Sequence, residues 1–296
     1  MLEAWRGTYT AIVTPFAPDG GIDVKSLRKL VDFQVEGGVE GVVPCGTTGE
    51  SATMDLEEQK KVVRTVLEQV DGRVLVLAGA GGNSTSQVTV VAREMQSLGA
   101  DGILSVVPYY NKPTQEGMYQ HFTRVADAVS IPMVLYNVPS RTGSNMLPET
   151  ALRLAEHDNV TGIKEASGNL LQAMEIIKGA PEDFRVLSGE DNLTFPLLGL
   201  GADGVISVVA NEVPMMMSRM VRDSLAGNWD EARKIHYKLL GLMNVNFVET
   251  NPIPAKAALA MMGIIEECYR MPLVPLRDES RAKLRQELVH LELISE

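Results

Sequence analysis

Histidine and cysteine are scarce in this chain, whose 296 residues include four histidines and two cysteines. No C-x-x-C or H-x-H spacing occurs, so the sequence offers no recognisable metal site, and we expect no metal. The two cysteines, Cys45 and Cys268, lie far apart in the sequence, which favours free thiols in a reducing compartment. No apolar run reaches the roughly 18 residues of a membrane span, and the first residues lack the pattern of a signal peptide. We therefore expect a cytoplasmic protein without a membrane segment.

Positive charge is also in short supply. The 27 Lys and Arg residues are outnumbered by 38 Asp and Glu residues, giving a formal net charge of −11 at pH 7. Such a chain repels nucleic acid and anionic membrane surfaces, so neither is an expected partner. The hydrophobic content of 45% is ordinary for a globular protein.

Short β-branched runs alternate with amphipathic helical segments along most of the chain. Each run is apolar on both faces, which is typical of parallel strands buried on both sides. Eight such units in succession predict a closed (β/α)8 TIM barrel. An open doubly wound sheet is the alternative, but the first run ends in Thr14-Pro15-Phe16 and not in a phosphate-binding glycine turn. The eight runs are Gly7–Pro15, Gly41–Gly46, Val74–Gly81, Gly102–Tyr110, Met133–Pro139, Val160–Ser167, Arg185–Asp191 and Gly204–Asn211.

The alternating pattern ends at about residue 228, after which only helical periodicity remains. We therefore expect a barrel over residues 1–227 and a small C-terminal helical region over residues 228–296. The helices predicted in that region are Trp229–Asn246, Pro254–Met262 and Ser280–Leu293.

The sixth predicted strand carries a lysine, Lys164. Barrel enzymes place their chemistry at the carboxyl ends of the strands. Burial of a lysine lowers its pKa, and the neutral amine can attack a carbonyl carbon. An ion pair with Glu165 is the structural alternative, but neighbouring residues of a strand point to opposite faces. Lys164 is therefore our candidate nucleophile for a Schiff-base aldolase that acts on a small keto acid.

The turn after the second strand, GTTGES, is a candidate carboxylate-binding site. Thr47 and Thr48 offer two hydroxyl groups and exposed backbone N–H groups in a glycine-flanked turn. A structural role is the alternative, in which Ser51 or Thr53 caps the following helix.

The fourth, fifth and seventh strands end in further polar groups. Tyr136 is expected to place its hydroxyl at the barrel mouth, and Arg141 just beyond it can hold a carboxylate through two hydrogen bonds. A surface salt bridge is the alternative for Arg141. For Tyr110, at the end of the fourth strand, the sequence alone favours packing. The acidic loop after the seventh strand argues against a phosphorylated substrate, and we count its Gly189 among the substrate-binding residues.

Six motifs occur in order between about Gly7 and Pro275, namely GTTGE, PYYN, YNVPSRTG, GIKEASGN, LSGED and GVISV. Together they resemble the dihydrodipicolinate synthase family of pyruvate-dependent aldolases, which are (β/α)8 barrels with a C-terminal helical region. The resemblance implies a Schiff-base condensation of pyruvate with L-aspartate 4-semialdehyde, without a cofactor, in lysine and diaminopimelate biosynthesis. It also implies a homotetramer built as a dimer of dimers.

The resemblance further implies a catalytic role for four residues. Lys164 forms the imine with pyruvate, and Tyr136 transfers protons during imine formation and later steps. Thr47 links Tyr136 to Tyr110, which the family supplies from the neighbouring subunit to complete a proton relay.

Three positions are implied to bind substrate. Thr48 and the backbone at Ile206 bind pyruvate, and Arg141 binds the carboxylate of the semialdehyde. The alternatives are N-acetylneuraminate lyase, a keto-deoxy-sugar-acid aldolase, or a barrel that binds ligands without catalysis. Arg141 favours the synthase, because an arginine suits a second carboxylate better than a polyol chain.

Feedback inhibition by lysine is expected to be weak or absent. The chain retains four residues of the inhibitor site of lysine-sensitive members, Ser51, Ala52, Asn83 and Tyr109. Where such members carry histidines, it has Leu56 and Gln59, and where they carry a glutamate, it has Gln87. A neutral Gln87 cannot pair with the ammonium group of lysine.

Overall fold

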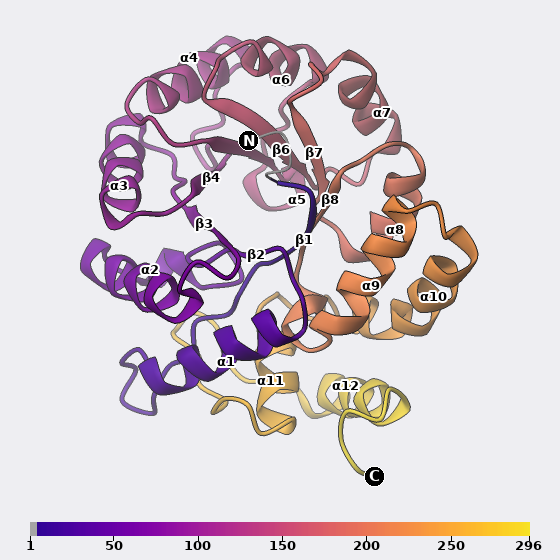
Figure 1. Cartoon of the computed structure of the whole chain (residues 1–296). Helices are drawn as coiled ribbons and strands as arrows, with labels where there is room; N and C mark the ends of the chain where they lie inside the picture. The colour runs from indigo at the N-terminus through magenta and orange to yellow at the C-terminus, as the bar shows by residue number, and fades with distance from the viewer. Residues whose placement is uncertain (1–4) are drawn as a thin grey trace.

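The computed structural model describes residues 5–296, in which eight parallel strands close into a barrel. Each strand pairs with the next along the chain, and β8 pairs with β1 to complete the ring (Figure 1). The predicted (β/α)8 barrel is therefore confirmed, and the open doubly wound sheet is excluded. The strands are β1 Gly7–Thr10, β2 Gly41–Val42, β3 Leu75–Gly79, β4 Gly102–Val106, β5 Met133–Asn137, β6 Val160–Glu165, β7 Arg185–Ser188 and β8 Gly204–Ser207.

All eight strands start within one residue of the predicted position, but each ends earlier. In β2 the predicted run extends to Gly46, whereas the strand ends at Val42. Pro44 has no N–H group for a strand ladder, and Cys45 adopts a φ of 57°. The residues predicted as strand ends thus form the loops at the barrel mouth.

Helices surround the barrel on its outer side (Figure 1). They are α1 Val24–Glu36, α2 Leu56–Val70, α3 Thr85–Leu98, α4 Gln115–Ala126, α6 Pro148–Ala155, α7 Leu170–Gly179, α8 Asp191–Gly199 and α9 Pro214–Leu225. The short α5 Pro139–Thr142 lies instead at the barrel mouth, and two 3-10 turns, η1 Ser51–Thr53 and η2 Val209–Asn211, complete the barrel. The prediction that Ser51 or Thr53 caps the second helix is wrong. Both residues lie in η1, and Asp55 is the N-cap of α2, accepting a hydrogen bond from Glu58 N at 2.9 Å.

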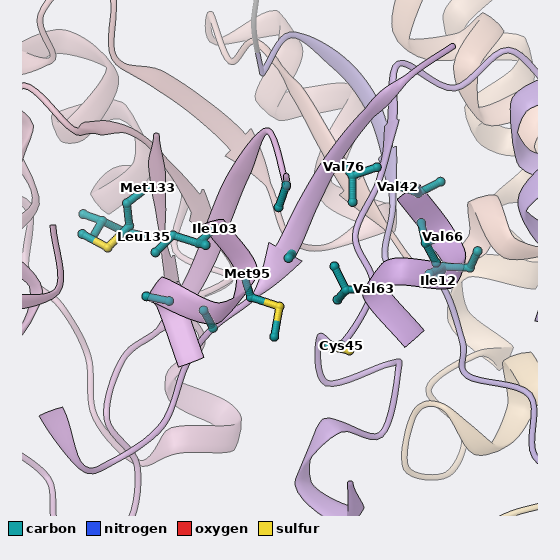
Figure 2. Packing of buried hydrophobic residues seen from close by; sticks show 14 of the residues in the cluster. Ile12, Val42, Cys45, Val63, Val66, Val76, Met95, Ile103, Met133 and Leu135 are labelled. Atoms are coloured by element: carbon teal, nitrogen blue, oxygen red, sulfur yellow. The ribbon is translucent and has the colours of Figure 1, made fainter. Parts of the chain in front are cut away.

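Alternate residues of the strands pack into two separate apolar layers. On β5, Val134 and Tyr136 belong to the cluster inside the barrel, whereas Met133 and Leu135 belong to the outer cluster. Figure 2 shows this outer layer, in which Val63 and Val66 of α2 and Met95 of α3 lie among strand residues such as Val76 and Ile103. This alternation fixes which side chains of each strand can reach the barrel interior.

Three helices follow α9 and pack beside the barrel, namely α10 Trp229–Val245, α11 Ile253–Met261 and α12 Asp278–His290. Each starts within two residues of its predicted position. They share one apolar cluster with α9 and with Val205 of β8, and Figure 1 shows α11 beside α1. No helix within residues 5–296 is long and apolar enough to cross a membrane.

Candidate active site

Lys164 and Tyr136 lie side by side in the barrel. β5 and β6 are neighbours, and Tyr136 pairs in register with Lys164. The Lys164 Nζ atom lies 4.3 Å from the centroid of the Tyr136 ring. Glu165 points to the opposite side, where it accepts hydrogen bonds from Asn137 Nδ2 at 3.1 Å and Gln172 Nε2 at 3.3 Å. The alternative of a Lys164–Glu165 ion pair is therefore excluded.

The amine of Lys164 is easily deprotonated. Burial lowers the pKa of Lys164 to about 8, because the charged form loses its hydration, and the positive charge of Arg141 acts in the same direction. The carboxylate of Asp191 opposes this shift. A pKa of about 8 leaves about one amine in ten neutral at pH 7, compared with one in a few thousand for an exposed lysine. Lys164 is thus suited to nucleophilic attack at neutral pH.

The hydroxyl group of Tyr136 stays protonated at neutral pH. Burial raises its pKa to about 12, and the negative charge of Glu190 adds to this shift. Arg141 and a hydrogen bond with the side chain of Thr47 lower the pKa in part. Tyr136 can therefore donate a proton beside the lysine amine and recover one through Thr47.

The turn after β2 presents Thr47 and Thr48 to the same space. The turn is closed by a hydrogen bond of 3.1 Å from Glu50 N to Thr47 O. Within residues 5–296, the backbone N–H groups of Thr47 and Thr48 donate to no protein atom, so both remain available to an anion. The Thr48 hydroxyl accepts a hydrogen bond from Asn251 Nδ2 at 3.0 Å.

These groups line one cavity of about 660 Å³ at the carboxyl ends of the strands. Six predicted site residues border it, namely Thr47, Thr48, Tyr136, Arg141, Lys164 and Gly189. Part of its lining comes from the C-terminal helical region, through Met243 and Asn244 of α10 and the following Phe247 and Asn251. The cavity therefore combines a buried amine, a hydroxyl donor, an anion-binding turn and a guanidinium group.

Gly189 has no side chain, and this leaves room for the side chain of Lys164. A Cβ atom at this position would lie 2.6 Å from Ala166 Cβ and 3.0 Å from Lys164 Cε. Both distances are shorter than ordinary carbon contacts, so any larger residue would displace the lysine.

Two predicted site residues lie outside this cavity. Ile206 was predicted to bind through its backbone; its side chain is fully buried inside the barrel, and Val208, two residues later, lines the cavity. Tyr110 is 88% exposed and has a φ of 71°. The packing favoured for Tyr110 on sequence grounds is thus wrong for this chain, which leaves its ring uncovered.

A second cavity of about 420 Å³ adjoins the first, with which it shares Thr47, Tyr136 and Arg141. Ser51, Ala52, Gln59 and Tyr109 line it as well. None of its lining residues is an aspartate or a glutamate. Leu56 and Gln87, in contrast, do not border it.

Sequence reasoning missed several residues of the cavity. Asp191 lies within the acidic loop after β7, and its Oδ2 atom accepts hydrogen bonds from Val208 N at 3.0 Å and Val209 N at 2.8 Å. Asn251 and Phe247 carry no local signal, because they reach the cavity only through the packing of α10 and α11 against the barrel. Among residues 5–296, no group of three His, Cys, Asp or Glu side chains is arranged to hold a metal ion.

Comparison with known proteins identifies the family. The model of the dihydrodipicolinate synthetase family matches residues 4–291. The chain belongs to the dihydrodipicolinate synthetase family. A 4-hydroxy-tetrahydrodipicolinate synthase from Pelobacter propionicus is 52% identical over 280 residues, which are 95% of this chain and 96% of that protein. Membership of the dihydrodipicolinate synthetase family makes the chain an enzyme, a lyase of the class I aldolase type.

Solved structures agree with this assignment. A dihydrodipicolinate synthase from Acinetobacter baumannii, complexed with pyruvate, has a TM-score of 0.96 at 43% identity and covers 98% of this chain and 99% of its own. The enzyme from Cyanidioschyzon merolae, with lysine bound, has a TM-score of 0.96 at 41% identity and covers the same shares. Both share the barrel and its C-terminal helices with this chain.

Proposed function

We propose that this enzyme condenses pyruvate with L-aspartate 4-semialdehyde and releases 4-hydroxy-tetrahydrodipicolinate. The observation that carries the proposal is the buried Lys164 amine, held beside the Tyr136 hydroxyl in a cavity with one anion-binding turn and one arginine. Two separate carboxylate-binding groups match two substrates that each carry a carboxylate. Relatives that are about half identical over nearly the whole chain have the same named activity.

In the proposed reaction, neutral Lys164 attacks the keto carbon of pyruvate, and Tyr136 protonates the departing oxygen, which leaves as water. The positive imine nitrogen acidifies the methyl group, and loss of a proton gives an enamine. Each positioned proton transfer contributes about 10²–10⁴-fold to the rate. Thr47 and Thr48 hold the carboxylate of pyruvate, the backbone at Ile206 completes its binding, and Gly189 keeps the wall beside the lysine open.

The enamine carbon then attacks the aldehyde carbon of the second substrate, whose carboxylate Arg141 binds. The amine of the semialdehyde attacks the imine carbon, closes the ring and displaces Lys164, which restores the free enzyme. The reaction needs no metal or organic cofactor, because the imine itself accepts the electron pair.

We also propose that the enzyme works as a cytoplasmic homotetramer, a dimer of dimers, in lysine and diaminopimelate biosynthesis. Within the dimer, Tyr110 of one subunit reaches the cavity of its partner and contacts Thr47 there. The exposed ring of Tyr110 supports this arrangement, since it has no cover in its own chain. The unpaired Cys45 and Cys268 suit a reducing compartment.

Borohydride trapping tests the proposal. Incubation with pyruvate and borohydride is expected to add one reduced pyruvate per chain, located on Lys164 by mass spectrometry, and a coupled assay with both substrates is expected to yield the ring product. Lys164→Ala should abolish both signals, whereas Lys178→Ala, an exposed lysine on α7, should retain them. Full trapping in Lys164→Ala would contradict the assignment.

A further inference from the structure

A second buried lysine, Lys256 of α11, lies beneath the turn that presents Thr47 and Thr48. Its side chain is fully buried, and Nζ lies 2.6 Å from Oε1 of Glu50, which is also buried. Nζ further lies 4.3 Å from the centroid of the Phe16 ring. Neither Lys256 nor Glu50 borders the active-site cavity, so the pair cannot touch a bound substrate.

Glu50 ends the anion-binding turn in an unusual backbone conformation. Its φ is 55°, in the left-handed region that non-glycine residues rarely adopt. Its N–H group bonds to the carbonyl oxygen of Thr47 at 3.1 Å, and its Oε2 atom accepts a bond from Arg270 N at 3.4 Å. The side chain of Glu50 is therefore the anchor that joins the turn to the C-terminal region, at Lys256 and Arg270.

The same C-terminal segment holds the turn at a second point. Asn251, five residues before Lys256, donates a hydrogen bond of 3.0 Å from Nδ2 to Thr48 Oγ1. A hydroxyl that accepts this bond keeps its own proton for another acceptor, and Thr48 lines the cavity. The C-terminal region thus fixes both the backbone of the turn and the direction of a hydroxyl donor.

A contribution to stability does not by itself explain why this ion pair is buried. The desolvation of two buried charges offsets most of their attraction, and apolar residues of similar volume often stabilise a fold equally well. What an ion pair adds is a defined geometry, which a turn that binds an anion through backbone N–H groups requires.

We propose that Lys256 is a positioning residue for the first substrate: its ion pair with Glu50 holds the turn in the shape that binds the carboxylate of the keto acid. This inference rests on the proposed function, and it extends the pyruvate site to a part of the chain outside the barrel. The role acts through Glu50, so its loss should weaken the binding of pyruvate without changing the chemistry of Lys164.

The test uses the double variant Lys256→Met/Glu50→Gln, which removes both charges and leaves no buried charge unpaired. Borohydride trapping is measured over a range of pyruvate concentrations and of pH, together with the KM for the semialdehyde and the melting temperature. We expect the half-saturating concentration of pyruvate to rise about tenfold. The pH profile of trapping, the KM for the semialdehyde and the melting temperature should stay close to those of the unmodified enzyme.

The matched control is Lys234→Met/Glu231→Gln, which removes an exposed Lys–Glu pair of 2.7 Å on α10 and should change none of these values. An unchanged half-saturating concentration of pyruvate in the Lys256 variant would overturn the proposal. Failure of that variant to fold would also overturn it, since the pair would then serve the fold as a whole. If the unmodified enzyme formed no pyruvate adduct, the proposed function itself would fail.

Discussion

The pKa of Lys164 determines the pH range over which the enzyme can capture its keto acid. Only the neutral amine attacks, and burial brings the pKa to about 8. We expect the initial rate of borohydride trapping to rise about tenfold per pH unit below that value and to level off above it. Rapid-mixing measurements between pH 6 and pH 10 test this, and a rate that stays flat down to pH 6 would contradict it.

Arg141 is expected to act on the second substrate. It is exposed at the barrel mouth and lines the same cavity as Lys164, where a guanidinium can hold a carboxylate. We predict that Arg141→Ala retains trapping with pyruvate but loses about 10- to 100-fold in kcat/KM for the semialdehyde, as is typical for one charge-assisted contact. Arg219→Ala, an exposed arginine on α9, serves as the control. Equal loss of both activities would mean that Arg141 organises the whole site.

Sequence reasoning located the reactive residues but not their supports. Strand alternation alone places Lys164 and Tyr136 on the inner face, because the period of two is local and fixed. Asn251 and Lys256 could not be found this way. Their roles depend on how α11 packs beneath a turn about two hundred residues earlier in the chain, and a sequence pattern carries no information on such contacts.

At the scale of the elements, periodicity predicted eight strands and three C-terminal helices but misplaced the strand ends. Residues such as Cys45 continue an apolar run, yet they adopt backbone angles that no strand allows. The 3-10 turn η1 was not predicted either. Ser51 and Thr53 have the residue types of helix N-caps, but Asp55 is the N-cap of α2. Loop geometry at the barrel mouth thus follows from backbone angles and long-range hydrogen bonds, which composition does not report.

The connection between η2 and α9 contains a buried acid, Glu212, with both carboxyl oxygens lacking a hydrogen-bond partner among residues 5–296. Burial raises its pKa well above 4.5, and the nearby Asn246 amide offsets only part of this shift. The folded chain therefore keeps the proton to higher pH than the unfolded chain does. The stability that the neutral carboxyl contributes below about pH 4.5 is lost as the pH rises towards the raised pKa.

Glu212→Gln should therefore raise the melting temperature by a few degrees at pH 8 and by less at pH 5, because glutamine does not ionise. Calorimetry at the two pH values measures the difference, with the exposed Glu182→Gln as a control that should show none. A variant that is less stable than the unmodified chain at pH 8 would show that the Glu212 carboxylate is ionised and bound to a partner.

At the scale of the whole molecule, the exposed Tyr110 predicts that activity depends on assembly. Tyr110→Phe and Lys164→Ala should each be inactive alone. In mixed oligomers, a Lys164→Ala subunit can supply its Tyr110 to a partner that carries Lys164, so some activity should return. Subunit exchange is followed by native mass spectrometry. No recovery despite proven exchange would place Tyr110 outside the mechanism.

Response to lysine is a second property of the assembled molecule. The smaller cavity brings Ser51, Ala52 and Tyr109 together, but none of its lining residues is an aspartate or glutamate that could form an ion pair with an ammonium group. The absence of one charge-assisted contact lowers affinity about 10- to 100-fold. We expect half-inhibition by L-lysine only above about a millimolar in a titration at fixed substrate. Stronger inhibition would mean that a carboxylate elsewhere replaces the missing one.

The lining of the active-site cavity comes from two parts of the chain. Barrel residues supply the reacting groups, whereas residues after α9 supply surfaces that can select the aldehyde substrate. The wall beside Lys164 cannot change, since even a methyl group at Gly189 would strike the lysine side chain. Met243, Asn244 and Phe247 also line the cavity. Within residues 5–296 none of them forms a hydrogen bond with Lys164 or with the anion-binding turn, whereas Asn251 bonds to Thr48. New acceptor aldehydes can therefore be sought by changing Met243 and Asn244 at the end of α10 and Phe247 just after it, with the residues around Lys164 left unchanged.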